Sequence, residues 1–225
     1  METVWSVCYT NLMFNAPSLL RIEENKALSA IRLEGSVLDL GGEKDSDYLK
    51  LIGGQFNVLT LNNDPAARAD INHDLEKELP FEDSSYDNVL LINVIEHIFN
   101  FRLLLAEAVR VLKPKGKLII VVPFLFPIHP SPNDHWRFTS QALEGEVRAV
   151  GVRELKITFL GSGVFASCFL FIDRLLPKFL RYLNYKILRH LMVSLDAAWS
   201  WLAKLLRKKY SKNDYPLGLV LVCTK

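Results

Sequence analysis

The sequence predicts a doubly wound α/β domain whose sheet is mostly parallel. Short apolar runs alternate along the chain with helically spaced segments, and this order builds parallel sheets through right-handed crossovers. The runs are apolar at consecutive positions, as in strands covered on both faces. One of them ends in Asp39-Leu40-Gly41-Gly42, and the ligands of open α/β sheets bind at such strand ends. The 225 residues, half of them hydrophobic, suffice for one such domain with additions.

Four segments have the spacing of helices, after an N-terminal stretch without regular pattern. The predicted helices cover residues 19–33, 48–52, 95–112 and 141–150. Ser18 can cap the first of them, and Thr139 or Ser140 can cap the last. Gly35 is expected to end the first helix and Pro114 the third, because proline cannot continue a helix.

Six apolar runs are predicted strands. They cover residues 37–40, 56–61, 87–93, 117–122, 152–160 and 217–223. The first five follow helices or turns in the order of a crossover fold. The last two flank a long helical segment, so we expect a helical insertion before the final strand.

The basic residues of the chain are concentrated in this insertion. From Arg174 to Lys212 there are ten Lys and Arg and one acid, Asp196, so this segment carries +9 and the rest of the chain −7. Its apolar residues recur at three and four positions, which predicts amphipathic helix. The segment can pack on the sheet, or dock on an anionic membrane surface. Nucleic-acid binding is a third option, but no stacking platform or recognised binding module supports it, so we expect no nucleic-acid partner.

Three cysteines, Cys8, Cys168 and Cys223, lie far apart, which argues against disulfides and zinc sites and fits a reducing cytoplasm. The N-terminus lacks the pattern of a signal peptide. The longest apolar run, 164–172, is shorter than the ~20 residues of a membrane-spanning helix. We expect a cytoplasmic protein that can contact a membrane peripherally through residues 174–212.

Five short motifs follow one another in a fixed order. They are Val37-Leu38-Asp39-Leu40-Gly41-Gly42, Asp74-Leu75 with Leu79-Pro80-Phe81, Ser85-Tyr86-Asp87, Val94-Ile95-Glu96-His97-Ile98, and Glu107-x-x-Arg110-Val111-Leu112-Lys113-Pro114-x-Gly116. This set resembles the class I S-adenosylmethionine-dependent methyltransferases, most of all their type 11 group. The loop 123–139 is similar to that of a subset met in bacterial surface-polysaccharide pathways. The resemblance implies a seven-stranded Rossmann-like sheet in a single domain, 1–225, with an N-terminal helical lead-in at 1–34 and the insertion at 164–212. It also implies that the strands 152–160 and 217–223 pair antiparallel.

The resemblance also implies the cofactor, S-adenosylmethionine, and the residues that hold it. Asp39, Gly41 and Gly42 would face its methionine part, Asn62 its ribose, Asp74 and Leu75 its adenine, and Asn93 its sulfonium end. Alternatively, Asp39 only ends a strand and bonds neighbouring amides, and Asp74 only caps a turn.

The sequence departs from the family pattern in two places, after the predicted strand 37–40 and after the predicted strand 56–61. Glu43 and Lys44 follow Gly41-Gly42 where the family has a third glycine. Asn62 stands where the family has an acid, so a charge-assisted bond worth ~1 kcal/mol or more is missing. Asp64 is close enough to substitute for it. The departures concern cofactor affinity and activity, not the fold.

The loop 123–138 holds the candidate catalytic residues. A histidine ordinarily titrates near neutrality, so His129 or His135 can act as the base that deprotonates an acceptor. Around them, Asp134 can orient an imidazole, Arg137 can bind an anionic group, Trp136 can stack on a sugar, and His97 can contact substrate. Alternatively Trp136 anchors the loop together with Phe138, Arg137 pairs with an acid, and His97 is a helix-start histidine. Two histidines without a third ligand predict no metal site.

These observations predict methyl transfer from S-adenosylmethionine, at an oxygen of a small-molecule or glycan-like acceptor. One alternative is a non-catalytic methyltransferase-like module that binds a partner through its basic helices. Another is a methyltransferase that acts on RNA or protein.

Overall fold

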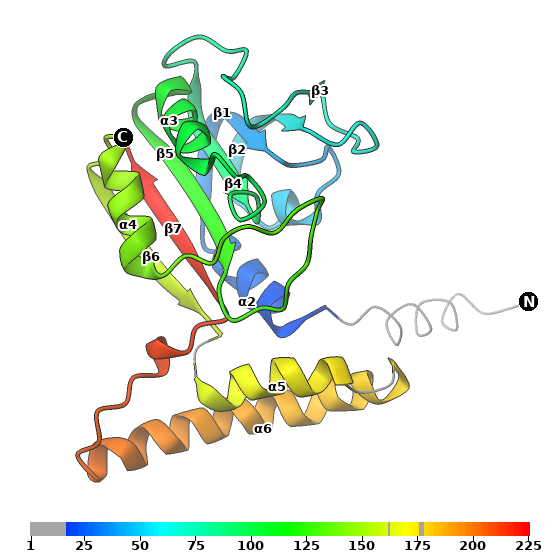
Figure 1. Ribbon diagram of the computed structural model, residues 1–225, viewed down its shortest axis with the longest axis vertical. Coiled ribbons are helices and arrows are strands. Elements are labelled where there is room, and N and C mark those ends of the chain that lie inside the picture. Colours follow the sequence, from blue (N-terminus) through cyan, green and yellow to red (C-terminus); the bar gives the residue numbers. More distant parts are fainter. Residues whose placement is uncertain (1–16, 162, 176–177) are drawn as a thin grey trace, which may run out of the picture. The chain divides into compact units, whose positions relative to one another are not determined.

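The computed structural model describes residues 17–161, 163–175 and 178–225, so Cys8 and the irregular stretch 1–16 lie outside the described residues. Its centre is a seven-stranded sheet in the order β3-β2-β1-β4-β5-β7-β6 (Figure 1). The strands are β1 Arg32–Leu40, β2 Gly53–Asn62, β3 Ile71–Asn72, β4 Tyr86–Ile92, β5 Leu112–Pro123, β6 Glu154–Leu160 and β7 Gly218–Thr224. The pairs among β1 to β5 are parallel, and β7 is antiparallel to β5. The predicted fold class is confirmed.

The apolar runs form the central strands because both faces of the sheet are covered. Residues 89–92 of β4 and 118–122 of β5 are all buried. Burying one Val, Leu or Ile side chain contributes about 1.5–3 kcal/mol, so these two strands anchor the sheet. The strand order reverses between β1 and β4, which places a ligand site at the carboxyl ends of these two strands.

The last two strands pair antiparallel, as predicted. The backbone N–H of Arg153 donates to the carbonyl of Thr224 at 3.1 Å, and that of Leu217 donates to Leu160 at 2.9 Å. The chain before β6 is thus bonded to the last residue of β7, and the last residue of β6 is bonded to the residue before β7. This pairing of one strand's start with the other strand's end is antiparallel. β7 thus lies between β5 and β6, and it is antiparallel to both of them.

The helices that serve the sheet differ from the predicted ones: the first three are shorter, and the last has the predicted length but is shifted by one residue. They are α2 Leu19–Leu28, the 3-10 helix η1 Asp47–Lys50, α3 Phe101–Val111 and α4 Ser140–Ala149. Ser18 accepts a hydrogen bond from the backbone N–H of Arg21, and Thr139 accepts one from Ala142, so both predicted caps are formed. α3 lies against β4 and β5 in Figure 1.

Two helix boundaries were predicted wrongly. The helix expected to reach residue 33 ends at Leu28, because Leu33 is fully buried in β1, which begins at Arg32. Gly35, expected as a helix end, lies inside β1 with φ +79°, where a Cβ would come within 2.5 Å of the Asp87 carboxylate. The helix expected from residue 95 begins only at Phe101, after turns over 94–100.

The chain forms two compact units, residues 24–158 with 218–225, and residues 159–217 with 1–23. The second unit contains α5 Val164–Leu175, α6 Lys178–Leu205 and η2 Lys212–Asp214. Asp196 of α6 is 4% exposed, and its carboxylate accepts the backbone N–H groups of Phe165 (3.0 Å) and Ala166 (2.8 Å). It thereby caps the first turn of α5 and fixes the two helices together. Within the described ranges, neither these helices nor the others combine the length and apolarity needed to cross a bilayer.

Candidate functional site

A cavity of about 680 Å³ opens at the carboxyl ends of β1, β2 and β4. Its lining comes from Gly41, residues 62–65, residues 75–76, residues 93–94, residues 97–98 and residues 131–133. Of the residues expected to bind cofactor or substrate, Gly41, Asn62, Leu75, Asn93 and His97 therefore meet around one space. Asp39, Gly42, Asp74 and the predicted residues 129 and 134–137 are not part of this lining.

The turn after β1 brings the backbone close to the cavity. Gly41 has φ +85°, which favours glycine, and a Cβ on it would clash with the Cγ2 methyl of Val94. A Cβ on Gly42 would clash with the Asp39 carboxylate. The sequence Gly41-Gly42 is therefore required by close packing between the turn, the strand end and the residue that follows β4.

Replacing Gly41 by alanine is expected to destabilise the protein and to block the cavity, since Val94 must move. Gly151→Ala is a matched control, because Gly151 also has a positive φ, +96°, but nothing lies within 4 Å of its Cβ position. Both variants bear the strain of a left-handed residue, about 1–2 kcal/mol. Only Gly41→Ala adds overpacking, about 1–3 kcal/mol more in urea unfolding. Equal losses in the two variants would show that the turn is not close-packed.

Asp39 lies beneath this turn and is fully buried. Its Oδ2 accepts a hydrogen bond from the Tyr48 hydroxyl at 2.6 Å, while its Oδ1 has no hydrogen-bond partner among the described residues. Burial raises the pKa of Asp39 to about 7, and the Tyr48 hydroxyl opposes this rise. A buried carboxylate oxygen without a partner can accept a cationic or N–H group of a ligand.

The side chain of Asn62 braces two strand ends. Its amide donates to the carbonyls of Gly41 (2.9 Å) and Gly42 (3.3 Å), and its Oδ1 accepts the backbone N–H of Asp64 at 2.9 Å. Both ends of the amide are used within the protein, so its ribose role stays a prediction. The exposed Asp64 also lines the cavity, and its role as a substitute ligand of the ribose hydroxyls stays a prediction.

Asn93 follows β4 in a left-handed conformation, φ +54°. Its backbone N–H donates to Val121 at 2.9 Å, which holds the strand end in place. Its side-chain Oδ1 is buried, lines the cavity region and has no hydrogen-bond partner among the described residues. This acceptor suits a cationic group, such as the ammonium of a methionine moiety.

On the adenine side, Leu75 is 2% exposed and supplies an apolar wall. Asp74 is directed elsewhere: it accepts the backbone N–H of Glu76 at 3.0 Å and pairs with Lys77 at 3.4 Å. The carboxylate of Glu76, in turn, accepts the N–H groups of Phe99 (2.7 Å) and Asn100 (3.0 Å) just before α3. The turn-cap interpretation of Asp74 fits these contacts, and its adenine role stays a prediction.

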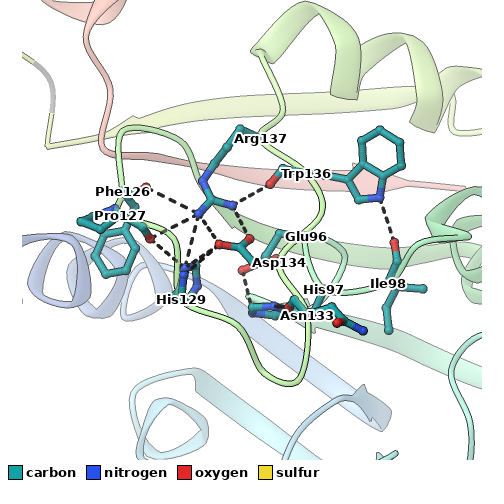
Figure 2. Close-up of polar contacts among 10 residues, drawn as sticks. All are labelled: Glu96, His97, Ile98, Phe126, Pro127, His129, Asn133, Asp134, Trp136 and Arg137. Carbon is teal, nitrogen blue, oxygen red and sulfur yellow. Dashed lines mark hydrogen bonds and ion pairs between the residues drawn. The ribbon is translucent and has the colours of Figure 1, made fainter.

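The proline-rich loop after β5 is fastened to the turn after β4 (Figure 2). The carbonyl of Glu96 accepts the N–H groups of His135 (2.8 Å) and Trp136 (3.1 Å). The Trp136 indole donates to the carbonyl of Ile98 at 3.0 Å and packs edge-on against Phe101, with ring centroids 5.2 Å apart. These contacts support the interpretation that Trp136 anchors the loop.

Arg137 and Asp134 form a partly buried two-point ion pair in this loop. The Arg137 guanidinium donates to Oδ1 (2.5 Å) and Oδ2 (2.7 Å) of Asp134, whose side chain is 2% exposed. The guanidinium holds the pKa of Asp134 well below its usual range. The alternative in which Arg137 pairs with an acid fits this geometry, and binding of an anionic substrate by Arg137 stays a prediction.

The three histidines of the site are not equivalent. The rings of His97 and His129 lie edge to face with centroids 5.0 Å apart, and His97 lines the cavity. Burial lowers the pKa of His129. The ring of His135 instead packs on Phe99 at 5.4 Å. The sequence interpretation missed Glu96, which is fully buried between these elements; its only signal was an acid beside His97.

The residues present fit S-adenosylmethionine, the cofactor that the resemblance implies. The glycine turn would lie against its methionine part, with the orphan oxygens of Asp39 and Asn93 as acceptors for the ammonium group. Asp64 offers a carboxylate to the ribose, and Leu75 an apolar wall to the adenine. The volume of the cavity is in the usual range of small-molecule sites.

Comparison with known proteins agrees with this assignment. A family model described as a methyltransferase domain matches residues 48–120. An uncharacterised protein of Methanocaldococcus jannaschii is 57% identical over 44 residues, which cover 20% of this chain and 19% of that protein.

Two solved structures resemble the whole chain in fold. One is a methyltransferase of Thermotoga maritima described as a possible histamine N-methyltransferase, 16% identical, with a TM-score of 0.57 over 98% of this chain and 96% of that one. The other, a methyltransferase of Archaeoglobus fulgidus, is 15% identical, with a TM-score of 0.54 over 99% and 100%. Residues 48–120 thus resemble a methyltransferase domain, and the chain as a whole has the fold of solved S-adenosylmethionine-dependent methyltransferases.

Proposed function

We propose that this chain transfers the methyl group of S-adenosylmethionine to an oxygen of a small-molecule or glycan-like acceptor. The observation that carries the proposal is the shared cavity. Residues expected to hold the cofactor line it together with His97 and residues 131–133 of the loop after β5. An acceptor placed there would lie beside the methyl group, and such positioning supplies much of the lowering of the barrier.

In the proposed reaction the acceptor hydroxyl loses its proton to a base and its oxygen attacks the methyl carbon. The carbon–sulfur bond breaks, the electron pair stays on sulfur, and S-adenosylhomocysteine leaves. His97 is the titratable ring that lines the cavity, and His129 stands beside it. The ring of His135 instead packs on Phe99. Proton removal by His129 is therefore favoured over removal by His135.

The experiment that tests this function is isothermal calorimetry with S-adenosylmethionine and S-adenosylhomocysteine. Asp64→Asn is expected to weaken binding about tenfold, because one charge-assisted bond to the ribose is replaced by a neutral one. Asp45→Asn is a matched control, since Asp45 pairs with Arg68 at the surface and lies outside the cavity lining. Absence of binding of either compound at millimolar concentration would favour the non-catalytic module. Methylation of RNA or protein is tested with the same protein and labelled cofactor.

We also propose peripheral membrane contact through residues 174–212, on the cytoplasmic leaflet, as suits a lipid-linked glycan acceptor. The support is the exposed end of α6 and the residues after it. Trp201 is 68% exposed and Leu205 is 65% exposed, while Arg207, Lys208 and Lys209 follow directly and are also exposed. Exposed aromatic and aliphatic side chains beside cations suit the headgroup region of an anionic bilayer.

Flotation with phosphatidylserine-containing liposomes tests the membrane proposal. The protein is expected to co-migrate with the liposomes at low salt and to lose most binding when Lys208 and Lys209 are changed to glutamate. Each basic residue near such a surface contributes about 1 kcal/mol. The control with the same change of charge is Lys50→Glu with Lys115→Glu, in the other compact unit. Equal binding by both double variants, or none by the unchanged protein, contradicts the proposal.

A further inference from the structure

Three side chains with metal-binding groups converge beside the cavity: Glu96, His97 and His129. One ligand atom from each lies within 4.8 Å of the others. Glu96 and His97 belong to the turn after β4, and His129 to the loop after β5, so two segments far apart in the sequence build the cluster (Figure 2). Both segments follow strand ends on the ligand side of the sheet.

Glu96 is the residue that the fold leaves unsatisfied. Its side chain is fully buried, and neither carboxylate oxygen has a hydrogen-bond partner among the described residues. The nearest cationic candidate is the His97 ring, with Nε2 3.7 Å from Oε1. Burying a carboxylate without a partner is costly, and a bound cation removes that cost. The backbone of Glu96 is fixed by its two bonds to the loop after β5, so the carboxylate is held in place.

The surrounding charges also favour a cation at this point. Glu24 and Asp134 act on the Glu96 carboxyl as like charges, whereas Arg137 is the opposing cation. Arg137 is itself engaged by both oxygens of Asp134. Two like charges and one opposing cation therefore act on this carboxyl.

Both histidines present the nitrogen that a metal requires. Nδ1 of His97 is 2.5 Å from the carbonyl oxygen of Asn133, and Nδ1 of His129 is 3.1 Å from that of Pro127. A carbonyl oxygen only accepts, so each Nδ1 carries the hydrogen and each Nε2 keeps its lone pair. Asp134 adds a carboxylate oxygen 3.3 Å from Nδ1 of His129. Metal-binding histidines are typically held in this way by a carbonyl or carboxylate.

Arg137 does not disturb this assignment. Its Nη2 lies 3.4 Å from Nδ1 of His129, but the same nitrogen donates to Asp134 at 2.7 Å. Nη2 carries two hydrogens, and for the second one the Pro127 carbonyl at 3.3 Å is a nearer acceptor than Nδ1 of His129, so the imidazole can itself donate from Nδ1.

We propose that Glu96, His97 and His129 bind one divalent first-row transition metal ion through a carboxylate oxygen and two Nε2 atoms. A carboxylate with two imidazoles is a donor set for zinc or ferrous iron that leaves coordination positions open. His97 lines the cavity, so the open positions are accessible from it. With the ion bound, Nε2 of His129 has no free lone pair, so an acceptor hydroxyl coordinated at an open position, its pKa lowered by the ion, loses its proton to solvent and not to His129. This use of the ion rests on the proposed function, whereas binding of the ion does not.

The test is titration of tag-free, metal-depleted protein with Co²⁺, followed by its visible absorption, and displacement of Co²⁺ by Zn²⁺. One equivalent is expected to bind. Glu96→Gln and His129→Ala should each weaken Co²⁺ binding more than about 100-fold. Loss of a residue that only hydrogen-bonds to a metal ligand costs about 10–100-fold. His135→Ala is the matched control in the same loop and should bind Co²⁺ like the unchanged protein, because His135 packs on Phe99.

Circular dichroism of the metal-free variants shows whether they fold. If His129→Ala does not fold, Glu96→Gln still tests the proposal, because glutamine has nearly the same shape as glutamate. Absence of stoichiometric Co²⁺ or Zn²⁺ binding to the unchanged protein overturns the proposal, and so does unchanged affinity in Glu96→Gln. S-adenosylmethionine binding is measured separately by calorimetry. A protein that binds the metal but not the cofactor refutes the proposed function and keeps the metal site.

Discussion

Replacing Glu107 by alanine is expected to lower the free energy of unfolding by about 3 kcal/mol, within the 3–5 kcal/mol typical of a broken buried pair. Glu107 of α3 is 7% exposed, and its Oε2 accepts the backbone N–H of the buried Leu79 at 2.7 Å. Arg110 donates to Oε1 and Oε2, both at 2.7 Å. Because the Arg110 side chain is 30% exposed, solvent screens part of the loss, which places the value at the lower end.

Urea unfolding compares this variant with two others. Glu107→Gln keeps an acceptor for Leu79 and is expected to lose about half as much, since only the charge is removed. Glu144→Ala, which breaks an exposed pair with Arg148 on α4, is expected to cost less than about 0.5 kcal/mol. A loss in Glu107→Ala no larger than that in Glu144→Ala would show that the pair does not hold α3 to the segment before β4.

The same pair explains why a sequence motif can be informative without being functional. Glu107 and Arg110 were part of the pattern that suggested a methyltransferase, and the structure uses them to fix residues 79–83. Arg110 binds the carbonyls of Leu79 and Phe81 as well as the Asp83 carboxylate. The motif therefore marks the fold, and the fold in turn positions the cavity.

The central strands could be predicted because burial on both faces leaves a continuous apolar run, as in residues 89–92 and 118–122. Their ends could not, because tertiary contacts decide them. Leu33 belongs to β1 since the sheet buries it, although its spacing fitted the preceding helix. β3, Ile71–Asn72, was missed because two residues carry no periodicity.

The site was predictable to the extent that it follows directly from strand ends. Gly41, Asn62 and Asn93 come just after or at the ends of β1, β2 and β4, and all three line the cavity. Side-chain direction was not predictable, because it depends on neighbours: the Asn62 amide turns back to the glycine turn. Glu96 was overlooked because its burial follows from the docking of a loop whose conformation the sequence does not reveal.

Asp39→Asn is expected to raise the free energy of unfolding by roughly 2 to 4 kcal/mol at pH 8 and to change it little at pH 4. Burial raises the pKa of Asp39 in the folded protein to about 7, from an ordinary value of 3.8. Between pH 3.8 and about 7 the Asp39 carboxyl is protonated in the folded state and ionised in the unfolded state. The free energy of unfolding therefore falls as the pH rises from about 4 to about 7. The amide has no proton to lose and keeps an acceptor for the Tyr48 hydroxyl.

Urea unfolding at pH 4 and pH 8, without cofactor, measures the effect as the difference between the two proteins. Asp45→Asn, at an exposed acid, is the control and should show no such difference. A pH-independent gain would mean that Asp39 is already ionised at low pH. If Asp39 meets the cofactor ammonium through its orphan oxygen, the more stable variant should also bind S-adenosylmethionine about tenfold more weakly. Stability gained together with affinity lost would show that this carboxylate is kept for binding, at a cost to the fold.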